Sequence, residues 1–297
     1  MRAIYGVLEE KTLNIRKKPE WLRKKNELSE HKKIYNLIED LSLHTICKEA
    51  LCPNISECFK NKQATFLILG RICTRRCSFC NVEKAIPAPP DDNEAGRVAE
   101  AIKRMGLKFA VITSPTRDDI PDGGAKYFIS TVDAIKMKNP DTMIEILIPD
   151  FAGKKEAIRM IAHSKADIIS HNLETVERLY DIRKGANYAL SLELLKEIKR
   201  INPDKPTKSG IMLGLGETEP EVIKLMNDLL SAGCSFLSVG QYLQPSLKHY
   251  PVVEYLTPEY FEKIKSIGLE LGFKHIESGP YVRSSYMAEK YIINRPL

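Results

Sequence analysis

The stretch ATFLILGRICTRRCSFC, residues 64–80, joins a short apolar run to three closely spaced cysteines. The run Thr65–Leu69 has the length and residue types of a buried strand, and Gly70 follows it. The cysteines then come in the spacing C-x3-C-x2-C, and we call them the second triplet: Cys73, Cys77 and Cys80. A buried strand followed directly by three thiols predicts a site at the carboxyl end of that strand.

Downstream of this strand, β-type runs alternate with helical patterns. The predicted strands are 65–69, 109–114, 143–148, 167–170, 209–213 and 236–239. The predicted helices are 94–105, 127–137, 154–163, 190–201, 220–232 and 258–271. Six β-α units in succession indicate an α/β fold with a parallel sheet and right-handed crossovers, as a partial barrel or a doubly wound sheet. In both arrangements, functional sites lie at the carboxyl ends of the strands.

Two of these helices carry recognisable N-terminal caps. Thr218 and Glu221 form a T-x-x-E capping box, and Thr257-Pro258 places a hydroxyl at the cap and a proline in the first turn. These signals fix where the last two helices begin.

Composition narrows the class of protein. The chain has 297 residues, 43% of them hydrophobic and 28% charged, without an apolar run of the length that a membrane span needs. Its N-terminus shows no secretory signal pattern, so we expect a cytoplasmic protein that does not bind membranes. In that reducing compartment, clustered cysteines are metal ligands or catalytic groups more often than disulfides.

The spacing of the second triplet suggests a cluster with one open position. A structural zinc site takes four protein ligands, whereas three thiolates on a four-iron cubane leave one iron free for a small molecule. The alternative is that the three cysteines, spaced i, i+4 and i+7, are small hydrophobes on one helix face. Arg75 and Arg76 between them, and the proline-rich stretch 87–90 after them, favour a loop.

A further group of three cysteines, which we call the first triplet, precedes the strand in the spacing C-x4-C-x5-C: Cys47, Cys52 and Cys58. His44 lies three residues before Cys47, so a Cys3His zinc site is an open alternative. Cys234 lies where a helix passes into a strand, and we interpret it as a packed core thiol.

Basic residues crowd the N-terminal segment, which also contains a helical apolar pattern at Ile34, Leu37, Ile38 and Leu41. These basic residues could bind an acidic protein or a nucleic acid, or they could form a solvated helix face. No RNA-binding aromatic signature accompanies them, so we expect no nucleic-acid partner. The basic residues are Lys17, Lys18, Arg23, Lys24, Lys25, Lys32 and Lys33.

The second triplet, as CTRRCSFC, resembles the C-x3-C-x-aromatic-C loop of the radical S-adenosylmethionine superfamily. The resemblance implies a partial (β/α)6 TIM-like barrel with N- and C-terminal extensions. It also implies a [4Fe–4S] cluster on Cys73, Cys77 and Cys80, whose open iron binds S-adenosylmethionine and cleaves it to a 5′-deoxyadenosyl radical. By the same resemblance, Phe79 packs near the adenine.

The first triplet, as C-x4-C-P-N-x3-C, is similar to the auxiliary-cluster motif of lipoyl synthases. The stretch Arg283-Ser284-Ser285-Tyr286 resembles the R-S-S-Y motif of that family, whose second serine is a fourth cluster ligand, which here is Ser285. Further stretches that fit the family are 18–22, 171–175, 208–218 and 240–246, so the resemblance covers about residues 16–288. The chain departs from the family pattern at Pro115-Thr116 and at Arg71.

The family resemblance implies three parts of the chain: an extension, 1–63, with the first triplet; the barrel, 64–275; and a segment, 276–297, that closes the auxiliary cluster. It implies insertion of two sulfur atoms at C6 and C8 of an octanoyl chain, drawn from a second [4Fe–4S] cluster. The implied partners are an octanoylated lipoyl carrier domain (glycine cleavage H protein or dehydrogenase E2), a ferredoxin or flavodoxin, and an iron–sulfur carrier protein. A cofactor-borne radical is needed because unactivated C–H bonds offer no handle for acid–base catalysis.

Three more residues are candidate contacts to the cofactor. Asn172 and Glu174 follow the fourth predicted strand and could bind it, or they could cap a helix. Arg183 could meet a carboxylate, or it could be a solvated cation. Two other functions remain alternatives: a different sulfur-inserting radical enzyme, resembling biotin synthase or the methylthiotransferases, and a non-catalytic iron–sulfur electron-transfer or carrier protein.

Overall fold

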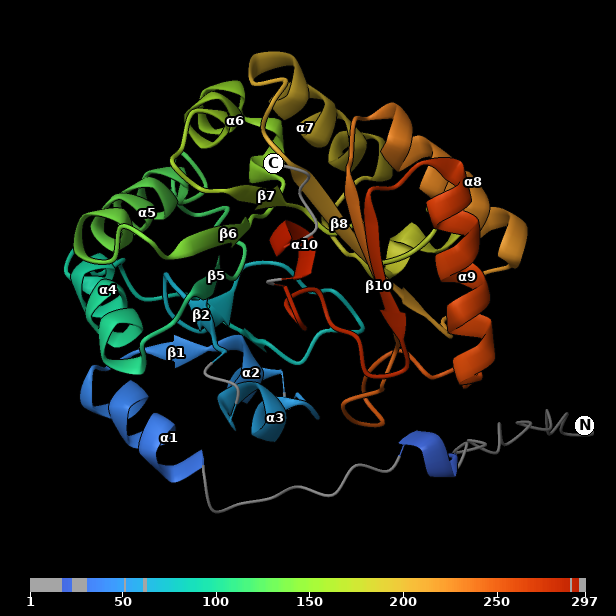
Figure 1. The fold of residues 1–297 in the computed structure, drawn as a ribbon, viewed down its shortest axis with the longest axis horizontal. Coiled ribbons are helices and arrows are strands. Elements are labelled where there is room, and N and C mark those ends of the chain that lie inside the picture. The colour runs from blue at the N-terminus through green and yellow to red at the C-terminus, as the bar shows by residue number, and fades with distance from the viewer. Residues whose placement is uncertain (1–17, 23–30, 51, 61–62, 289, 294–297) are drawn as a thin grey trace, which may run out of the picture.

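In the computed structural model, the strands of the largest sheet form an arc, and helices lie on its outer side (Figure 1). The structure describes residues 18–22, 31–50, 52–60, 63–288 and 290–293. Within these ranges, the largest sheet has eight strands in the order β1-β2-β5-β6-β7-β8-β9-β10. Their bounds are β1 His44–Thr45, β2 Thr65–Leu67, β5 Phe109–Thr113, β6 Met143–Leu147, β7 Ile168–Ser170, β8 Thr207–Leu213, β9 Phe236–Gln241 and β10 His275–Gly279.

Strand order decides between the two predicted architectures. Strands β2 to β10 of this sheet are all parallel, and each pairs with the next one along the chain; only β1 is antiparallel. A doubly wound sheet reverses its strand order at a switch point, and this sheet does not reverse. The fold is therefore the predicted partial barrel.

The predicted helices are all present, with ends that differ by at most two residues. Helices α4 and α9 match their predicted bounds, and both end at a glycine with positive φ, Gly106 and Gly272. The capping box of Thr218 and Glu221 is confirmed. The bounds are α4 Glu94–Met105, α5 Ala125–Lys138, α6 Lys155–Ala162, α7 Tyr188–Ile201, α8 Glu219–Ser231 and α9 Pro258–Leu271.

Three features of the sheet were not predicted from the sequence, the first being the antiparallel strand β1. β10 adds a seventh parallel strand, paired with β9 from His275 to Gly279. β8 begins at Thr207 rather than at Ser209, because Lys208 is fully buried in the sheet and paired with an acidic side chain. Charged residues in a strand hide its buried character from a hydrophobicity pattern.

The core lies between the sheet and the outer helices. Outward-facing residues of β5 and β6, such as Ala110, Ile112 and Ile146, pack against α4 to α6 in one large cluster. On the inner face, Ala288 and Tyr291 pack against strand residues Phe109, Val111, Ile168 and Phe236. The C-terminal segment, including α10 (Lys290–Ile293), thus lies inside the arc (Figure 1).

The extension carrying the first triplet lies at the open side of the arc (Figure 1). It comprises η1 (Glu20–Leu22), α1 (His31–Asp40), β1, α2 (Ile46–Glu49) and α3 (Ile55–Lys60). The predicted apolar pattern of α1 is confirmed, since Ile38 is buried and Ile34, Leu37 and Leu41 pack on the core. Most of the basic residues of the N-terminal segment lie outside the described part of the chain. They are Lys17, Arg23, Lys24 and Lys25, together with the side chains of Lys32 and Lys33.

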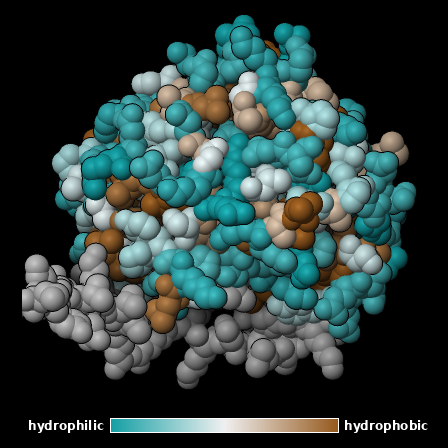
Figure 2. Space-filling view, turned by 180° about the vertical axis from the view of Figure 1, so that it is seen from behind, coloured by the Kyte–Doolittle hydropathy of each residue, from teal (hydrophilic) through white to brown (hydrophobic). Residues whose placement is uncertain are grey.

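The outer surface is mostly polar. The face seen from behind is largely hydrophilic, with hydrophobic residues scattered over it (Figure 2). Within the described ranges, every helix is too short or too polar to cross a bilayer.

Candidate functional site: two groups of cysteines at opposite ends of one strand

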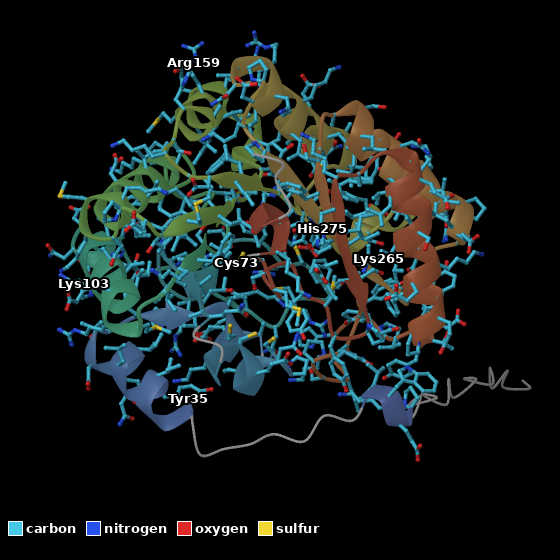
Figure 3. The ribbon with its side chains drawn as sticks, viewed as in Figure 1. Tyr35, Cys73, Lys103, Arg159, Lys265 and His275 are labelled. Atoms are coloured by element: carbon cyan, nitrogen blue, oxygen red, sulfur yellow. The ribbon has the colours of Figure 1, made fainter. Side chains whose placement is uncertain are left out.

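Cys73, the first residue of the second triplet, lies within the arc (Figure 3). Cys73 belongs to β3 (Ile72–Cys73), which pairs with β4 (Glu83–Lys84), and the residues between these strands form turns rather than a helix. The alternative of three small hydrophobes on one helix face is therefore wrong. By contrast, the cations Lys103, Arg159 and Lys265 stand on the outer helices, away from Cys73 (Figure 3).

Leu69 fixes the direction in which the chain leaves β2. Its φ of 67° is in the left-handed region, which non-glycine residues rarely adopt. Its backbone N–H donates to Glu94 at 2.7 Å, and its carbonyl accepts from Arg117 at 2.9 Å. Glu94 and Arg117 are both buried, so this conformation is held from both sides before the chain reaches Cys73.

Arg75 clamps the loop of the second triplet to the barrel. Its guanidinium donates two hydrogen bonds of 2.6 Å to Asp150 and two more, of 2.9 and 3.1 Å, to Asp118. Burial alone would raise the pKa of Asp150, but the hydrogen bonds from Arg75 hold it below its ordinary value. Asp118 and Asp150 follow β5 and β6, so a single side chain between Cys73 and Cys77 ties the loop to two strand ends.

The cysteines of the second triplet are partly exposed, but the surrounding protein desolvates the thiols of Cys77 and Cys80. Burial raises the pKa of Cys80 to about 12 and raises that of Cys77, against the lowering effect of Arg183. Thiolate ligation would therefore release protons here when a cluster binds. The N–H of Arg75 already points to the sulfur of Cys73 at 3.4 Å.

Of the predicted cofactor contacts, Phe79 lies in this loop, and Asn172, Glu174 and Arg183 follow β7. Phe79 packs on the cluster of Ile182, Leu215 and Tyr242. Asn172 donates to Glu174 at 3.0 Å, and Arg183 donates to the carbonyl of Asn172 at 2.9 Å. Burial raises the pKa of Glu174 despite the nearby Arg183.

Unpartnered polar atoms point to a missing polar ligand at this end of the barrel. Within the described residues, buried polar atoms without a hydrogen-bond partner include Ser114 Oγ, His171 Nε2, Thr175 Oγ1 and Arg183 Nε. All four residues follow the carboxyl ends of β5 or β7. Buried polar groups are nearly always paired in native proteins, so the end of the barrel that carries the second triplet fits a polar cofactor.

The first triplet lines a pocket together with the predicted serine. Its walls include Cys47, Cys52, Cys58 and Ser285, which come from segments more than 200 positions apart in the sequence. His44 does not line this pocket within the described residues. The geometry thus favours Ser285 over His44 as the fourth ligand, and three thiols with one hydroxyl fit an iron–sulfur cluster in their donor chemistry.

Hydrogen bonds hold the C-terminal segment against the first triplet. Asn54, buried between Cys52 and Cys58, donates to the carbonyl of Tyr281 at 2.6 Å. Arg283 also lines the pocket, and burial lowers its pKa against the raising effect of Cys52. A cation beside the thiols would stabilise the negative charge of a bound cluster.

The two triplets lie at opposite ends of β2. The pocket of the first triplet includes Ala64 and Thr65, where β2 begins, and the second triplet follows its carboxyl end. Within the described residues, no three His, Cys, Asp or Glu side chains are arranged to hold one metal ion. A four-iron cubane distributes its protein ligands over separate irons, so both triplets remain candidates for cluster sites. Cys234 is buried against backbone carbonyls, as predicted for a core thiol.

Neither departure from the family pattern alters the thiols. The backbone carbonyl of Thr116 accepts from both the N–H and the hydroxyl of Thr74, so its side chain is not needed for that contact. Arg71 is exposed and pairs with Glu83 at 3.6 Å.

Comparison with known proteins shows the family of this chain. The model of the Radical SAM superfamily matches residues 67–229. A lipoyl synthase of Geobacter sp. (strain M21) is 56% identical over 276 residues, which are 93% of this chain and 95% of that protein. The chain belongs to the lipoyl synthase family. Membership of the radical SAM superfamily implies a [4Fe–4S] cluster and S-adenosylmethionine as cofactors.

Other lipoyl synthases match as completely. The enzyme of Geobacter metallireducens is 55% identical over 94% of this chain and 99% of its own, and that of Trichlorobacter lovleyi is 54% identical over 94% and 100%. Among solved structures, the hydrogenase maturase HydG from Carboxydothermus hydrogenoformans has a TM-score of 0.58 at 17% identity, covering 82% of this chain and 65% of that one. Streptococcus suis SuiB gives 0.56 at 13% identity, covering 82% and 56%. These structures share the fold.

Several residues that organise the site were missed by the sequence reasoning. Arg75 and its two aspartates lie in three separate loops, and only the order of the strands brings them together. The buried pair of Lys208 and Glu145 was hidden because both are charged residues within strands. The available signal was the C-x-R-x-C spacing, in which a cation lies between two thiols.

Proposed function

We propose that this member of the lipoyl synthase family inserts two sulfur atoms, at C6 and C8 of a protein-bound octanoyl chain, using a different iron–sulfur cluster at each triplet. In this proposal Cys73, Cys77 and Cys80 hold the cluster that binds S-adenosylmethionine. Cys47, Cys52, Cys58 and Ser285 hold an auxiliary [4Fe–4S] cluster that donates the sulfur. The observation that carries the proposal is the shared pocket of Ser285 and the first triplet.

At the second triplet, bound S-adenosylmethionine and the reduced cluster would supply a radical that removes hydrogen atoms from unactivated carbon. The protein's part is to orient the cofactor and to exclude water. Asn172, Glu174 and Arg183 form a linked polar wall behind the loop, and Phe79 offers an aromatic surface on the apolar cluster beside it. The unpartnered atoms His171 Nε2 and Arg183 Nε are available to the cofactor's polar groups.

Ser285 would give the cluster at the first triplet one oxygen ligand beside its three thiolate ligands. An oxygen ligand is harder than a thiolate and suits iron–sulfur chemistry less well. The iron held by Ser285 would therefore be released first when the pocket gives up sulfide. Each sulfur inserted replaces one C–H hydrogen, and each abstraction converts one S-adenosylmethionine to methionine and 5′-deoxyadenosine.

The partners follow from this chemistry. The substrate would be an octanoylated lipoyl carrier domain, either of a glycine cleavage H protein or of a dehydrogenase E2. Reduction needs a low-potential donor such as ferredoxin or flavodoxin, and rebuilding the auxiliary site needs an iron–sulfur carrier protein. A cytoplasmic location fits these partners.

Mass spectrometry of an octanoylated carrier peptide, after anaerobic turnover with dithionite and S-adenosylmethionine, tests the reaction. We expect two sulfurs gained per peptide and 5′-deoxyadenosine formed alongside. Methylthiolation would indicate a different sulfur-inserting enzyme, and absence of 5′-deoxyadenosine would exclude radical catalysis.

Replacing Ser285 tests whether the iron that it would hold is the one released first. Ser285→Cys should keep the auxiliary cluster but slow transfer of sulfur, since the fourth iron would then be held by thiolate. Cys234→Ala is the matched control, because it removes a buried thiol outside both triplets. A Ser285→Cys protein that made product at the unmodified rate would remove the case for a labile iron.

A further inference from the structure

The inner wall of the barrel is shaped to receive the segment that contains Ser285. On β9, Gly240 faces the carbonyl of Val282, and a Cβ at position 240 would collide with that carbonyl. Gly240 has no positive φ, so its backbone does not require glycine. The missing side chain instead allows the backbone of the C-terminal segment to lie directly against the strand.

Two other strands of the same sheet carry a fully buried ion pair. Lys208 on β8 and Glu145 on β6 have no exposed side-chain surface and meet at 3.0 Å. Ser170 on β7 donates to the same carboxylate at 2.6 Å. A buried pair is costly unless its remaining hydrogen-bonding capacity is used, and the pair by itself leaves donors of the Lys208 ammonium free.

One of the remaining donors of the Lys208 ammonium binds the segment that contains Ser285. It donates to the carbonyl of Ser284 at 2.5 Å. This carbonyl belongs to the planar peptide group that joins Ser284 to Ser285. Because the Cα of Ser285 lies in the plane of this peptide group, fixing the direction of the carbonyl also restricts the position of that Cα.

Ser284 is held at its side chain as well. Its hydroxyl donates to Asn172 Oδ1 at 3.0 Å, and the amide nitrogen of Asn172 donates to Glu174. The residue before Ser285 is therefore fixed at two points, one on its carbonyl and one on its hydroxyl. Neither point lies in the pocket of the first triplet.

We propose that Lys208 is a positioning residue for the auxiliary site: through the Ser284 carbonyl, it holds Ser285 at the pocket of the first triplet. The inference rests on the proposed role of Ser285 as a ligand. Glu145 accepts hydrogen bonds from the ammonium and so holds it in place, and Gly240 leaves room for the segment to reach it. Among the described residues that line the pocket of the first triplet, Lys208 is absent, so it would act through the segment rather than as a ligand.

The test measures the two clusters separately in the full-length protein. In a background where Cys73, Cys77 and Cys80 are replaced by alanine, only the first triplet can hold a cluster. Lys208→Met with Glu145→Gln removes both charges together, so that no buried charge is left unpaired. We expect auxiliary iron and sulfide to be retained about tenfold less well after gel filtration, from the loss of one charge-assisted hydrogen bond.

A second variant and a second readout separate positioning from general damage. Gly240→Ala should give the same loss by displacing Val282. With the second triplet intact, both variants should still cleave S-adenosylmethionine to 5′-deoxyadenosine. Equal loss of both clusters would mean that the ion pair serves only the fold, and would overturn the proposal.

Ser285→Ala, in the same background, keeps the two proposals distinguishable. If Ser285→Ala loses the oxygen-ligated iron signal in Mössbauer spectra and the Lys208 variant does not, the positioning role is wrong and the ligand role stands. If Ser285→Ala leaves the spectrum unchanged, the ligand role fails first, and the positioning role fails with it.

Discussion

The hydroxyl of Tyr286 donates to a carboxylate oxygen of Glu57 at 2.8 Å, across 229 positions of sequence. Glu57 precedes Cys58 of the first triplet, and Tyr286 follows Ser285. The contact therefore joins the two segments that form the auxiliary pocket, one residue away from a proposed ligand on each side.

Tyr286→Phe should weaken retention of the auxiliary cluster several-fold, because one hydrogen bond to a charged group is lost while the ring remains. Iron per chain after gel filtration, in the background without the second triplet, measures the effect. Tyr188→Phe is the matched control, since it removes a 2.8 Å bond to Asp228 on the outer helices. Equal iron loss in both variants would contradict a local role for Tyr286.

Arg75→Lys should destabilise the loop of the second triplet. Lysine keeps the charge but cannot make the paired hydrogen bonds to Asp150 and Asp118. We expect a loss of about 2–4 kcal/mol in the free energy of unfolding of the cluster-free protein, since Asp150 is left poorly paired in a buried place. Urea denaturation measures it. The neighbouring Arg76→Lys changes an exposed side chain and should have little effect.

His171 should make stability depend on pH. Burial, followed by the charge of Arg183, lowers its pKa from 6.5 to about 4. Between these values the unfolded chain binds a proton that the folded protein does not, so stability falls as the pH is lowered from 6.5 to about 4. The expected loss is about 3 kcal/mol at the lower end of this range.

Urea denaturation from pH 7 to pH 4 tests this in the cluster-free protein, at pH steps of roughly half a unit across the transition of histidine. His171→Gln should flatten this part of the profile. His163→Gln, at an exposed position, should not. Parallel profiles for all three proteins would show that another group governs acid stability.

Arg283→Gln should lower the reduction potential of the auxiliary cluster. The guanidinium lies beside Cys52 in the pocket, and removing its positive charge disfavours the added electron. We expect a shift of roughly 60 mV or more, a tenfold change in the one-electron equilibrium. A redox titration followed by electron paramagnetic resonance measures it. Arg283→Lys retains the charge and should restore most of the potential.

Local sequence patterns predicted most of the barrel because its helices and its parallel strands, except β10, each carry their own signal. Leu69-Gly70 and Thr257-Pro258 marked element ends that the structure confirms closely. β10 was missed because Glu277 interrupts its apolar pattern. The start of β8 was missed because the burial of Lys208 depends on Glu145 in another strand, and no local window contains both residues.

The candidate site was only partly predictable for a related reason. Spacing identified both triplets, but Ser285 came from a resemblance to a family, since one serine among many has no distinguishing spacing. Arg75 and Lys208 could not be assigned, because each acts through residues that are distant in sequence.

Asn172 lies between the two cysteine sites. Its amide oxygen accepts from Ser284, next to the proposed auxiliary ligand Ser285, and its amide nitrogen donates to Glu174, a proposed contact of S-adenosylmethionine. By thermodynamic reciprocity, if loading the auxiliary site changes the affinity for S-adenosylmethionine, the cofactor changes the affinity of the auxiliary site by the same factor.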